Sequence, residues 1–185
     1  MKTAIVLGSG STYLEFREKV EAFADTCDFR IGLNLCEYAN TTHHMFTNTK
    51  RFKDYHNTRN EKAELYIGST IKQDVIDATG IKKYKRIDND IRSQRTVGVL
   101  AISFAKEVLE AEKVYVVGMD GYCLRFGQTQ HCYNNTKDDD QEGQPMYSYG
   151  KDLTVYKQLA EVAKRVNFSI ITPTIFMPFY EEGIL

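Results

Sequence analysis

A carboxylate and a phenol follow a short apolar run in the sequence VYVVGMDGY, Val114 to Tyr122. The run is rich in β-branched residues, which is typical of a strand buried on both faces of a parallel sheet. It stops at Gly118, and Asp120 and Tyr122 come almost at once. In open α/β sheets, ligands sit in the crevice beyond the carboxyl ends of the strands. The stretch therefore predicts a ligand site or, alternatively, an ordinary turn in which Asp and Gly serve only the backbone.

A glycine-rich loop is the second candidate. GSGST begins at Gly8, with Ser9, Gly10 and Ser11 next, and it lies between an apolar run and a helical pattern over Tyr13 to Thr26. Strand, glycine loop and helix in this order are typical of loops whose amides hold a phosphate. The loop is neither a GxGxxG motif nor a P-loop with its lysine. The alternative is a tight turn in which Ser11 or the residue after it caps the helix.

Polar side chains also end the next two predicted strands. Arg30 to Leu35 leaves Asn34 near its end, and His44 to Thr47 is followed by Lys50 and Arg51. A ligand shared by several strand ends would lie there, although each basic residue alone fits a solvated surface. The adjacent histidines at positions 43 and 44 indicate packing or surface roles, because neighbours on a strand point to opposite faces.

The order of elements indicates the fold class. Apolar runs alternate with helical patterns, which predicts an α/β, Rossmann-like, three-layer single domain over residues 1–185 with a mainly parallel sheet. The first, second and fifth runs, at residues 3–7, 30–35 and 114–118, are expected to be parallel near-neighbours. The other predicted strands are Glu64 to Ile67 and Phe168 to Thr172, and the other predicted helices are Thr70 to Thr79, Thr96 to Ala111 and Lys151 to Val166. The helix from Thr96 is apolar almost all round near its start and is expected to be buried.

Two polar stretches remain between these elements. In the hinge from Lys82 to Gln94, Asp88 and Asp90 would suit Mg²⁺, which prefers carboxylates and water, or they belong to a capping loop. Cys123 to Gly150 has no sustained period, which is typical of a functional lid or of disorder. Its run of three acids, at residues 138–140, is expected to be solvated. Its adjacent His131 and Cys132 match no familiar zinc-finger spacing.

The bulk composition narrows the partners and the compartment. The 185 residues carry a formal net charge of −1 with both signs interspersed, so nothing favours nucleic acid or an anionic membrane, while small anionic ligands stay possible. The four cysteines form no CxxC motif, and no secretion signal or long apolar run occurs. We therefore expect a cytoplasmic protein without a transmembrane segment. A homo-oligomer remains possible.

Several of these stretches resemble a known group of transferases. RTVGVLAISFAKEVLEAEKVYVVGMDGY, then a polar loop, a helix and IITPT, is similar to the C-terminal half of the bacterial family 42 sialyltransferases. The same outline occurs in the domain of unknown function 115, in motility-associated flagellin glycosyltransferases and in an archaeal hydroxymethyl-dihydropterin pyrophosphokinase. It also resembles a domain appended to aldolase-like proteins in polysaccharide gene clusters. The outline covers most of the chain.

The resemblance implies roles for particular residues. A CMP-sugar donor would be held by the glycine loop (Gly8, Ser9, Gly10, Ser11), by Asn34, and by Arg95, Thr96 and Gly98 before and within the central helix. Tyr122 would assist the leaving phosphate. In the family the catalytic base is a histidine shortly before the last helix, where this chain reads YSYGK and has none. Either His131, farther upstream, has taken this role, or the chemistry differs.

These observations predict a transferase that uses a nucleotide-activated donor, most plausibly a glycosyltransferase of surface-polysaccharide or glycoconjugate synthesis. The mechanism would be direct displacement at the anomeric carbon, with His131 or Asp120 as base and Tyr122 with Arg95 at the leaving group. Thr172, which ends the last strand, is a further candidate for donor binding. The leading hypothesis requires no metal or other cofactor. The alternatives are a Mg²⁺-dependent pyrophosphokinase that uses Asp88, Asp90 and Asp120, and a non-catalytic nucleotide- or sugar-binding module.

Overall fold

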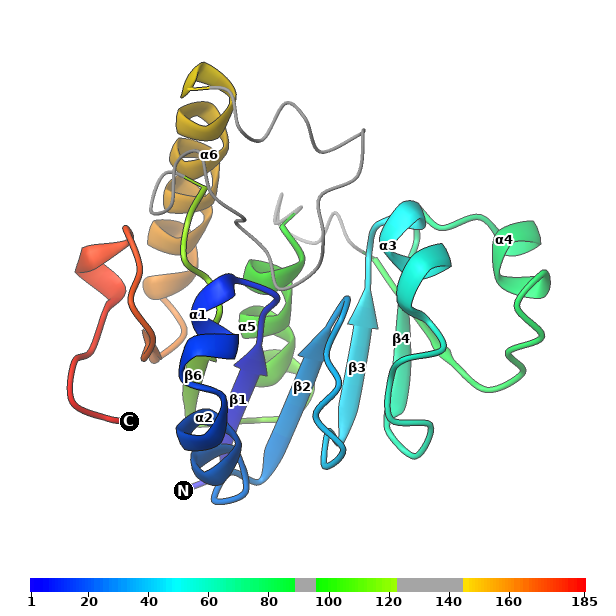
Figure 1. Ribbon diagram of the computed structural model, residues 1–185, viewed down its shortest axis with the longest axis horizontal. Coiled ribbons are helices and arrows are strands. Elements are labelled where there is room, and N and C mark those ends of the chain that lie inside the picture. Colours follow the sequence, from blue (N-terminus) through cyan, green and yellow to red (C-terminus); the bar gives the residue numbers. More distant parts are fainter. Residues whose placement is uncertain (89–95, 123–144) are drawn as a thin grey trace.

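The computed structural model describes residues 1–88, 96–122 and 145–185, and in these the strands form one parallel sheet of seven, in the order β5-β4-β3-β2-β1-β6-β7 (Figure 1). The side chains of residues 145–148 are not described. The strands are β1 (Thr3–Leu7), β2 (Phe29–Leu33), β3 (His43–Phe46), β4 (Glu64–Gly68), β5 (Lys85–Ile87), β6 (Lys113–Val117) and β7 (Phe168–Ile170). The predicted α/β class with a mainly parallel sheet is confirmed.

The order of strands places the strand that begins the chain at the centre of the sheet. β1 pairs in parallel with β2 on one side, Leu7 opposite Gly32, and with β6 on the other, Leu7 opposite Val117. The prediction that these three strands are parallel near-neighbours in one sheet is thus confirmed. From β1 the chain winds outward to β5 and then returns to β6, so the direction of winding reverses between β1 and β6. Such a reversal opens a crevice at the carboxyl ends of the two strands.

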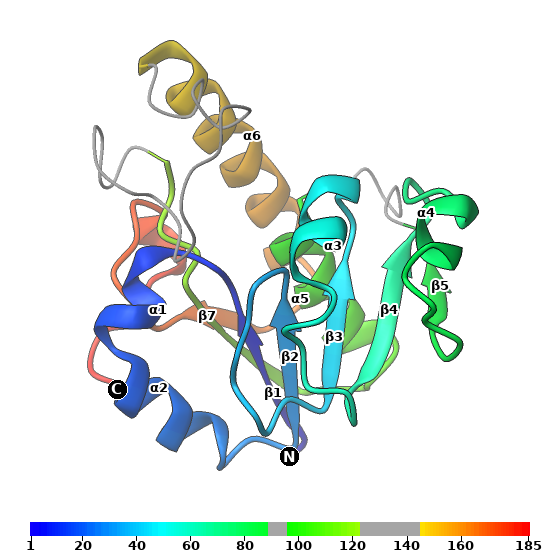
Figure 2. The same cartoon turned by 45° about the vertical axis from the view of Figure 1, so that its right-hand side comes forward.

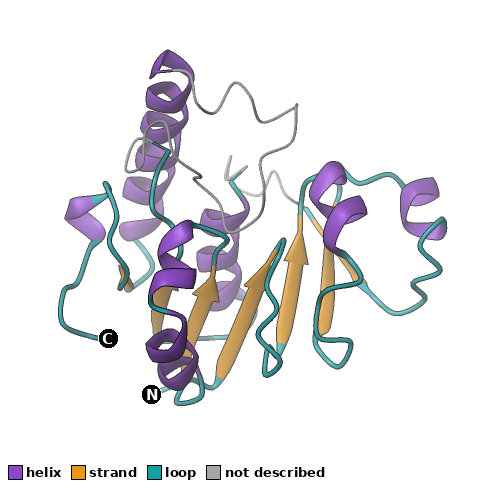
Figure 3. Cartoon of the chain, in the orientation of Figure 1, coloured by secondary structure: helices purple, strands orange, loops and turns teal. Residues whose placement is uncertain are grey.

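Helices cover both faces of the sheet (Figure 3). On one face lie α1 (Ser11–Glu15), α2 (Arg17–Ala24), α3 (Thr49–Tyr55) and α4 (Gln73–Asp77), and on the other lie α5 (Val97–Glu107) and α6 (Pro145–Ala163). A short 3-10 turn, η3 (Met177–Phe179), follows β7. None of the helices in the described ranges is long and apolar enough to cross a membrane.

Alternating side chains of the strands build the core on both faces. In β1, Ala4 and Val6 pack with α5 and α6, while Ile5 and Leu7 pack with α1 and α2, and all four are fully buried. Consecutive residues of a strand point to opposite faces, so a strand covered on both faces reads as a continuous apolar run. The predicted burial of the central helix is also confirmed, because every residue of α5 from Gly98 to Ala105 is buried.

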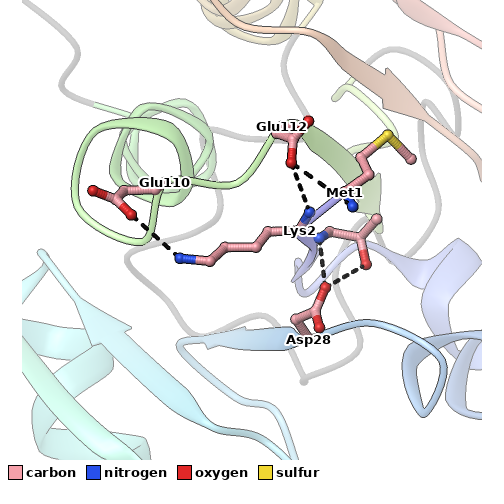
Figure 4. A network of polar contacts seen from close by, with 6 residues as sticks. Met1, Lys2, Asp28, Glu110 and Glu112 are labelled. Carbon is pink, nitrogen blue, oxygen red and sulfur yellow. Dashed lines mark hydrogen bonds and ion pairs between the residues drawn. The ribbon is translucent and has the colours of Figure 1, made fainter.

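Polar contacts fix the amino end of β1, at the edge of the sheet away from its carboxyl ends (Figure 4). The Thr3 N–H donates to the Asp28 carboxylate at 2.7 Å, and the Lys2 N–H donates to Glu112 at 3.1 Å. Asp28 precedes β2 and Glu112 precedes β6, so these contacts align β1 with both neighbours. Each is exposed to solvent, where single ion pairs and hydrogen bonds stabilise little.

Two helices differ from the sequence-based expectation. The single helix expected over Tyr13 to Thr26 is two helices, because Phe16 (φ −107°, ψ 16°) ends α1 and begins α2. The helix expected from Lys151 begins at Pro145, so its first turns occupy the end of the predicted lid. The rest of that lid, residues 123–144, lies outside the described residues.

Two further elements were not expected at all. α3 is a short polar helix that buries few of its side chains, so its apolar period is weak. Asn48 caps it by accepting the Arg51 N–H at 3.0 Å. β5 lies at the edge of the sheet beside β4 and reads Lys-Arg-Ile, which had been assigned to a polar hinge (Figure 2). Charged residues are common on edge strands, because they discourage pairing with other chains, and they hide such strands from pattern analysis.

Candidate functional site

A cleft of about 610 Å³ lies at the carboxyl ends of β1, β2, β3 and β6. α3 stands near one end of this edge and α6 near the other (Figure 1). The walls come from the glycine loop, the turn after β2, the start of α3, the start of α5, the loop after β6 and the first half of α6. This is the crevice that the reversal of winding between β1 and β6 creates.

Most of the predicted site residues lie on these walls: Gly8, Ser9, Gly10, Asn34, Thr96, Gly98, Asp120 and Tyr122. The cleft thus brings Gly8 to Gly10 together with Asp120 to Tyr122. Ser11 and Thr172 are not among the lining residues. Arg95 and His131 lie outside the described residues, so their predicted roles stay predictions.

The glycine loop packs directly against the end of β6. The Gly8 N–H donates to Val117 O and the Gly10 N–H to Gly118 O, both at 2.9 Å, so these two amides extend the β1–β6 ladder. A Cβ at Gly10 would lie 2.4 Å from Gly118 O and 2.6 Å from the Asp120 carboxylate. Gly118 itself has a φ of 64°, which favours glycine. The glycines are thus required for the close approach of the two loops.

Asp120 fixes the glycine loop to the β6 end. It is 4% exposed, and its carboxylate accepts the Thr12 N–H at 2.9 Å, the Ser11 hydroxyl at 3.2 Å and the Thr12 hydroxyl. These contacts make Asp120 an anchor between the two loops, and its predicted role as a general base stays a prediction. Ser11 likewise serves this anchor and does not line the cleft.

A second acid, which the sequence did not single out, holds the end of the same loop. Asp152, near the start of α6 and 6% exposed, accepts the Tyr122 N–H at 2.7 Å. Gly121, between the two acids' contacts, has a φ of 90°. The buried carboxylates of Asp120 and Asp152 therefore fix both ends of the segment that presents Tyr122. The only signal in the sequence was an acid early in a predicted helix, which has many ordinary explanations.

Threonines support the loop from beneath. Thr172 is fully buried, and its hydroxyl accepts the Gly118 N–H at 3.0 Å. The Thr174 hydroxyl donates to Met119 O at 2.7 Å. The prediction that Thr172 binds the donor places it on the cleft wall, whereas the structure places it under the wall. The residues that follow β7 thus contribute to the site indirectly, because they fix the backbone of the loop after the neighbouring strand β6.

The start of α5 and the first half of α6 form the opposite wall. The Thr96 N–H, at the N-cap of α5, donates to the Gln158 side chain of α6 at 3.2 Å. A Cβ at Gly98 would lie 2.4 Å from the flexible end of Met119 and 3.9 Å from Leu33 Cδ1. Both predicted residues therefore line the cleft where α5 and α6 meet.

Among the residues that the structure describes, the basic ones that line the cleft are Lys50, Arg51 and Lys151. The expectation of a solvated surface is wrong for Arg51, which is 7% exposed. Lys50 forms an ion pair with Asp54 at 3.3 Å. The acids on the walls, Asp120 and Asp152, accept backbone N–H groups. The lining therefore combines side chains that can attract an anion with carboxylates already bound by the protein.

The carboxylates proposed for magnesium do not form one group. Asp88 follows β5, which is five strand positions from β6, and at about 4.8 Å per position the separation is roughly 24 Å. Asp88 and Asp120 cannot share one ion at that separation, and Asp90 lies outside the described residues. Within the described ranges, no group of three or more His, Cys, Asp or Glu could hold a metal.

Both adjacent histidines have packing roles, as expected. The His43 ring lies against Phe29, Tyr66 and Phe104, with centroids 5.9 to 6.1 Å apart. His44 points to the other face of the sheet and is fully buried. Neither histidine belongs to a metal cluster of the described residues.

Comparison with models of known protein families gives no match, and comparison with curated proteins gives none either.

Proposed function

We propose that the protein is a transferase that binds a nucleotide-activated donor in this cleft, most plausibly a glycosyltransferase of surface-polysaccharide or glycoconjugate synthesis. The observation that supports the proposal most is convergence. The resemblance implies donor contacts by the glycine loop, Asn34 and the start of α5, and a leaving-group role for Tyr122. Gly8 to Gly10, Asn34, Thr96, Gly98 and Tyr122 all line one cleft.

The size and lining of the cleft suit a ligand of this class. Small-molecule sites typically have volumes of about 300–1,000 Å³, and the cleft has about 610 Å³. Its basic side chains complement a phosphate, and its apolar lining, which includes Val97, Val155 and Phe176, suits a base or a sugar face. The location at the reversal of strand winding is the usual one for nucleotides in open α/β sheets.

The reaction would be displacement at the anomeric carbon, with the donor's phosphate as leaving group. Asp152 fixes the backbone of Tyr122 at the cleft, and the Tyr122 hydroxyl would donate its hydrogen toward the charge that develops on that phosphate. Arg95 would add positive charge, and His131 would take the proton of the acceptor hydroxyl. Asp120 would act indirectly, by fixing the glycine loop to the loop after β6.

A thermal-shift panel tests the binding step. The panel contains CMP, CMP-N-acetylneuraminic acid, UDP-N-acetylglucosamine, ATP and inorganic phosphate, each with and without Mg²⁺. A ligand at a hundred times its dissociation constant stabilises the fold by about 2.7 kcal/mol, which corresponds to a rise in Tm of roughly 5–10 °C for a chain of this size. A shift by a sugar nucleotide without Mg²⁺ is the expected result. A shift by ATP only with Mg²⁺ would favour the pyrophosphokinase alternative, and no shift at all would contradict the proposal.

Tyr122→Phe tests the catalytic step. Loss of one preorganised donor should reduce kcat by roughly 10²–10³, while Kd for the donor and the Tm stay nearly unchanged. Tyr156→Phe is the matched control, because Tyr156 is 40% exposed and does not line the cleft. Unchanged turnover in Tyr122→Phe would remove Tyr122 from the catalytic group. Donor affinity without any turnover in the wild type would favour the binding-module alternative.

A further inference from the structure

The turn after β2 is held from three sides. The Ser9 hydroxyl lies 3.1 Å from Leu33 O and 3.3 Å from Leu35 O, and so contacts the carbonyls on both sides of Asn34. The Asn34 N–H donates to Met45 O at 3.3 Å. The Asn34 carbonyl accepts from His44 Nε2 at 2.8 Å. Residues of β3 and of the glycine loop thus fix a single residue at the edge of the cleft.

The partner of His44 determines the tautomer of its ring. A carbonyl oxygen can only accept, so Nε2 carries the proton and Nδ1 is the bare nitrogen. A Cβ at Gly32 would lie 2.9 Å from His44 Nδ1 and 3.2 Å from the Cys36 Sγ. Arg59 is the charged group that acts on the ring. Complete burial lowers the pKa of His44 to about 4. The neutral ring therefore donates to Asn34 throughout the ordinary pH range.

Asn34 has an uncommon backbone conformation. Its φ is 50°, in the left-handed region, which is unfavourable for residues with a Cβ although least so for Asn. Glycine would adopt this conformation at lower cost, so the side chain of Asn34 needs a separate reason. Asn34 lines the cleft, and its Oδ1 is buried without a hydrogen-bond partner among the residues that the structure describes. Buried polar groups normally have a hydrogen-bond partner, and a ligand in the cleft could supply one to the Asn34 amide.

We propose that His44 is a positioning residue of the ligand site, which acts with Ser9 to hold Asn34 in the left-handed conformation that presents its amide to the ligand. The proposal rests on the proposed function of the cleft. Without the Nε2 donor, the Asn34 carbonyl loses its partner and the turn can relax to ordinary backbone angles. If the held conformation is then populated a tenth of the time, the apparent Kd rises about tenfold.

The test compares three substitutions at the adjacent histidines. His44→Phe keeps the ring volume and removes the donor, whereas His44→Gln can place an N–H near the position of Nε2. His43→Phe is the matched control, because its ring packs on the other face of the sheet and does not contact Asn34. Kd is measured for CMP and CMP-N-acetylneuraminic acid at a temperature well below each Tm. Backbone chemical shifts and the hydrogen-exchange rate of the Asn34 N–H are measured without ligand.

We expect His44→Phe to raise Kd at least about tenfold, to move the Asn34 shifts out of the left-handed range and to accelerate exchange. His44→Gln should restore all three readouts, and His43→Phe should change none of them. Wild-type affinity in folded His44→Phe would overturn the positioning role while leaving the proposed function intact. If the wild type binds neither nucleotide, the proposed function fails. Unchanged Asn34 shifts in His44→Phe would then also overturn the clamp, which is the set of contacts from His44 and Ser9 that holds the turn at Asn34.

If His44→Phe does not fold, Ser9→Ala provides the second route. It removes the other half of the clamp by deleting a hydroxyl that contacts Leu33 O and Leu35 O. The same shift of Asn34 out of the left-handed range is expected. Unchanged Asn34 shifts and exchange in Ser9→Ala would count against the clamp.

Discussion

Removal of the Asp120 carboxylate distinguishes an anchor from a catalytic base. In Asp120→Ala, the Thr12 N–H loses its acceptor in a buried site, and two hydroxyls lose theirs. A hydrogen bond to a charged group contributes about 1.5–3 kcal/mol, and a buried donor left unsatisfied costs about 1–3 kcal/mol. Since the small hydroxyls can rotate toward other partners, we expect the free energy of unfolding to fall by about 3–4 kcal/mol in total.

Asp120→Asn should be milder for a geometric reason. Its oxygen can still accept the Thr12 N–H, and its NH₂ can donate to the Thr12 hydroxyl, which can reverse its role. Only the contribution of the charge is lost, which we estimate at about 1–2 kcal/mol. For a chain of this size each kcal/mol lowers Tm by roughly 2–4 °C, so Asp120→Ala should lower it by about 10 °C and Asp120→Asn by roughly 4 °C.

Asp28 offers a matched control. Its carboxylate also accepts the N–H and the hydroxyl of one threonine, Thr3, but at the exposed edge of the sheet. Asp28→Ala should therefore destabilise the fold much less than Asp120→Ala does. Urea unfolding followed by circular dichroism measures all three variants, and Thr12→Val completes a double-mutant cycle with Asp120→Asn. A stability of Asp120→Ala within about 0.5 kcal/mol of the wild type, with turnover abolished, would refute the anchor and restore the base.

Two further predictions concern stability. The folded state disfavours protonated His44, whose pKa lies at about 4 against 6.5 for an unperturbed histidine, so the free energy of unfolding should decrease by about 3 kcal/mol as the pH falls from 6.5 to 4. His44→Gln should remove that part of the pH dependence in urea titrations, and an unchanged slope would contradict the assignment. Gly10→Ala should lower stability by about 1–3 kcal/mol or more, because its Cβ would meet Gly118 O at 2.4 Å. Gly150→Ala, with open space around its Cβ and a place in α6, should instead stabilise by up to about 1 kcal/mol; equal effects of the two alanines would contradict the close-packing explanation.

The sequence by itself determined the parts of the fold that depend on local composition. The apolar runs of β1 and β6 identify strands buried on both faces, because such strands need apolar residues at every position. α5 was recognisable for the same reason, since it is apolar almost all round. α3 and β5 were not predicted, because polar side chains dominate both. α3 is a short helix that buries only one edge, and β5 lies at the edge of the sheet. Their positions depend on tertiary neighbours.

The candidate site also has features that the sequence predicts and features that only the tertiary structure decides. Residues that end strands could be assigned to one edge from the sequence, because parallel strands deliver their carboxyl ends to the same side, and Gly8, Asn34 and Tyr122 do line one cleft. The separate roles of these residues required the tertiary structure. Asp120 meets Thr12 across 108 positions of the chain, and His44 meets Asn34 across a strand pair. A carboxylate that accepts three hydrogen bonds and one that is free to take a proton have the same letter in a sequence, and only the donors brought to them by folding distinguish the two.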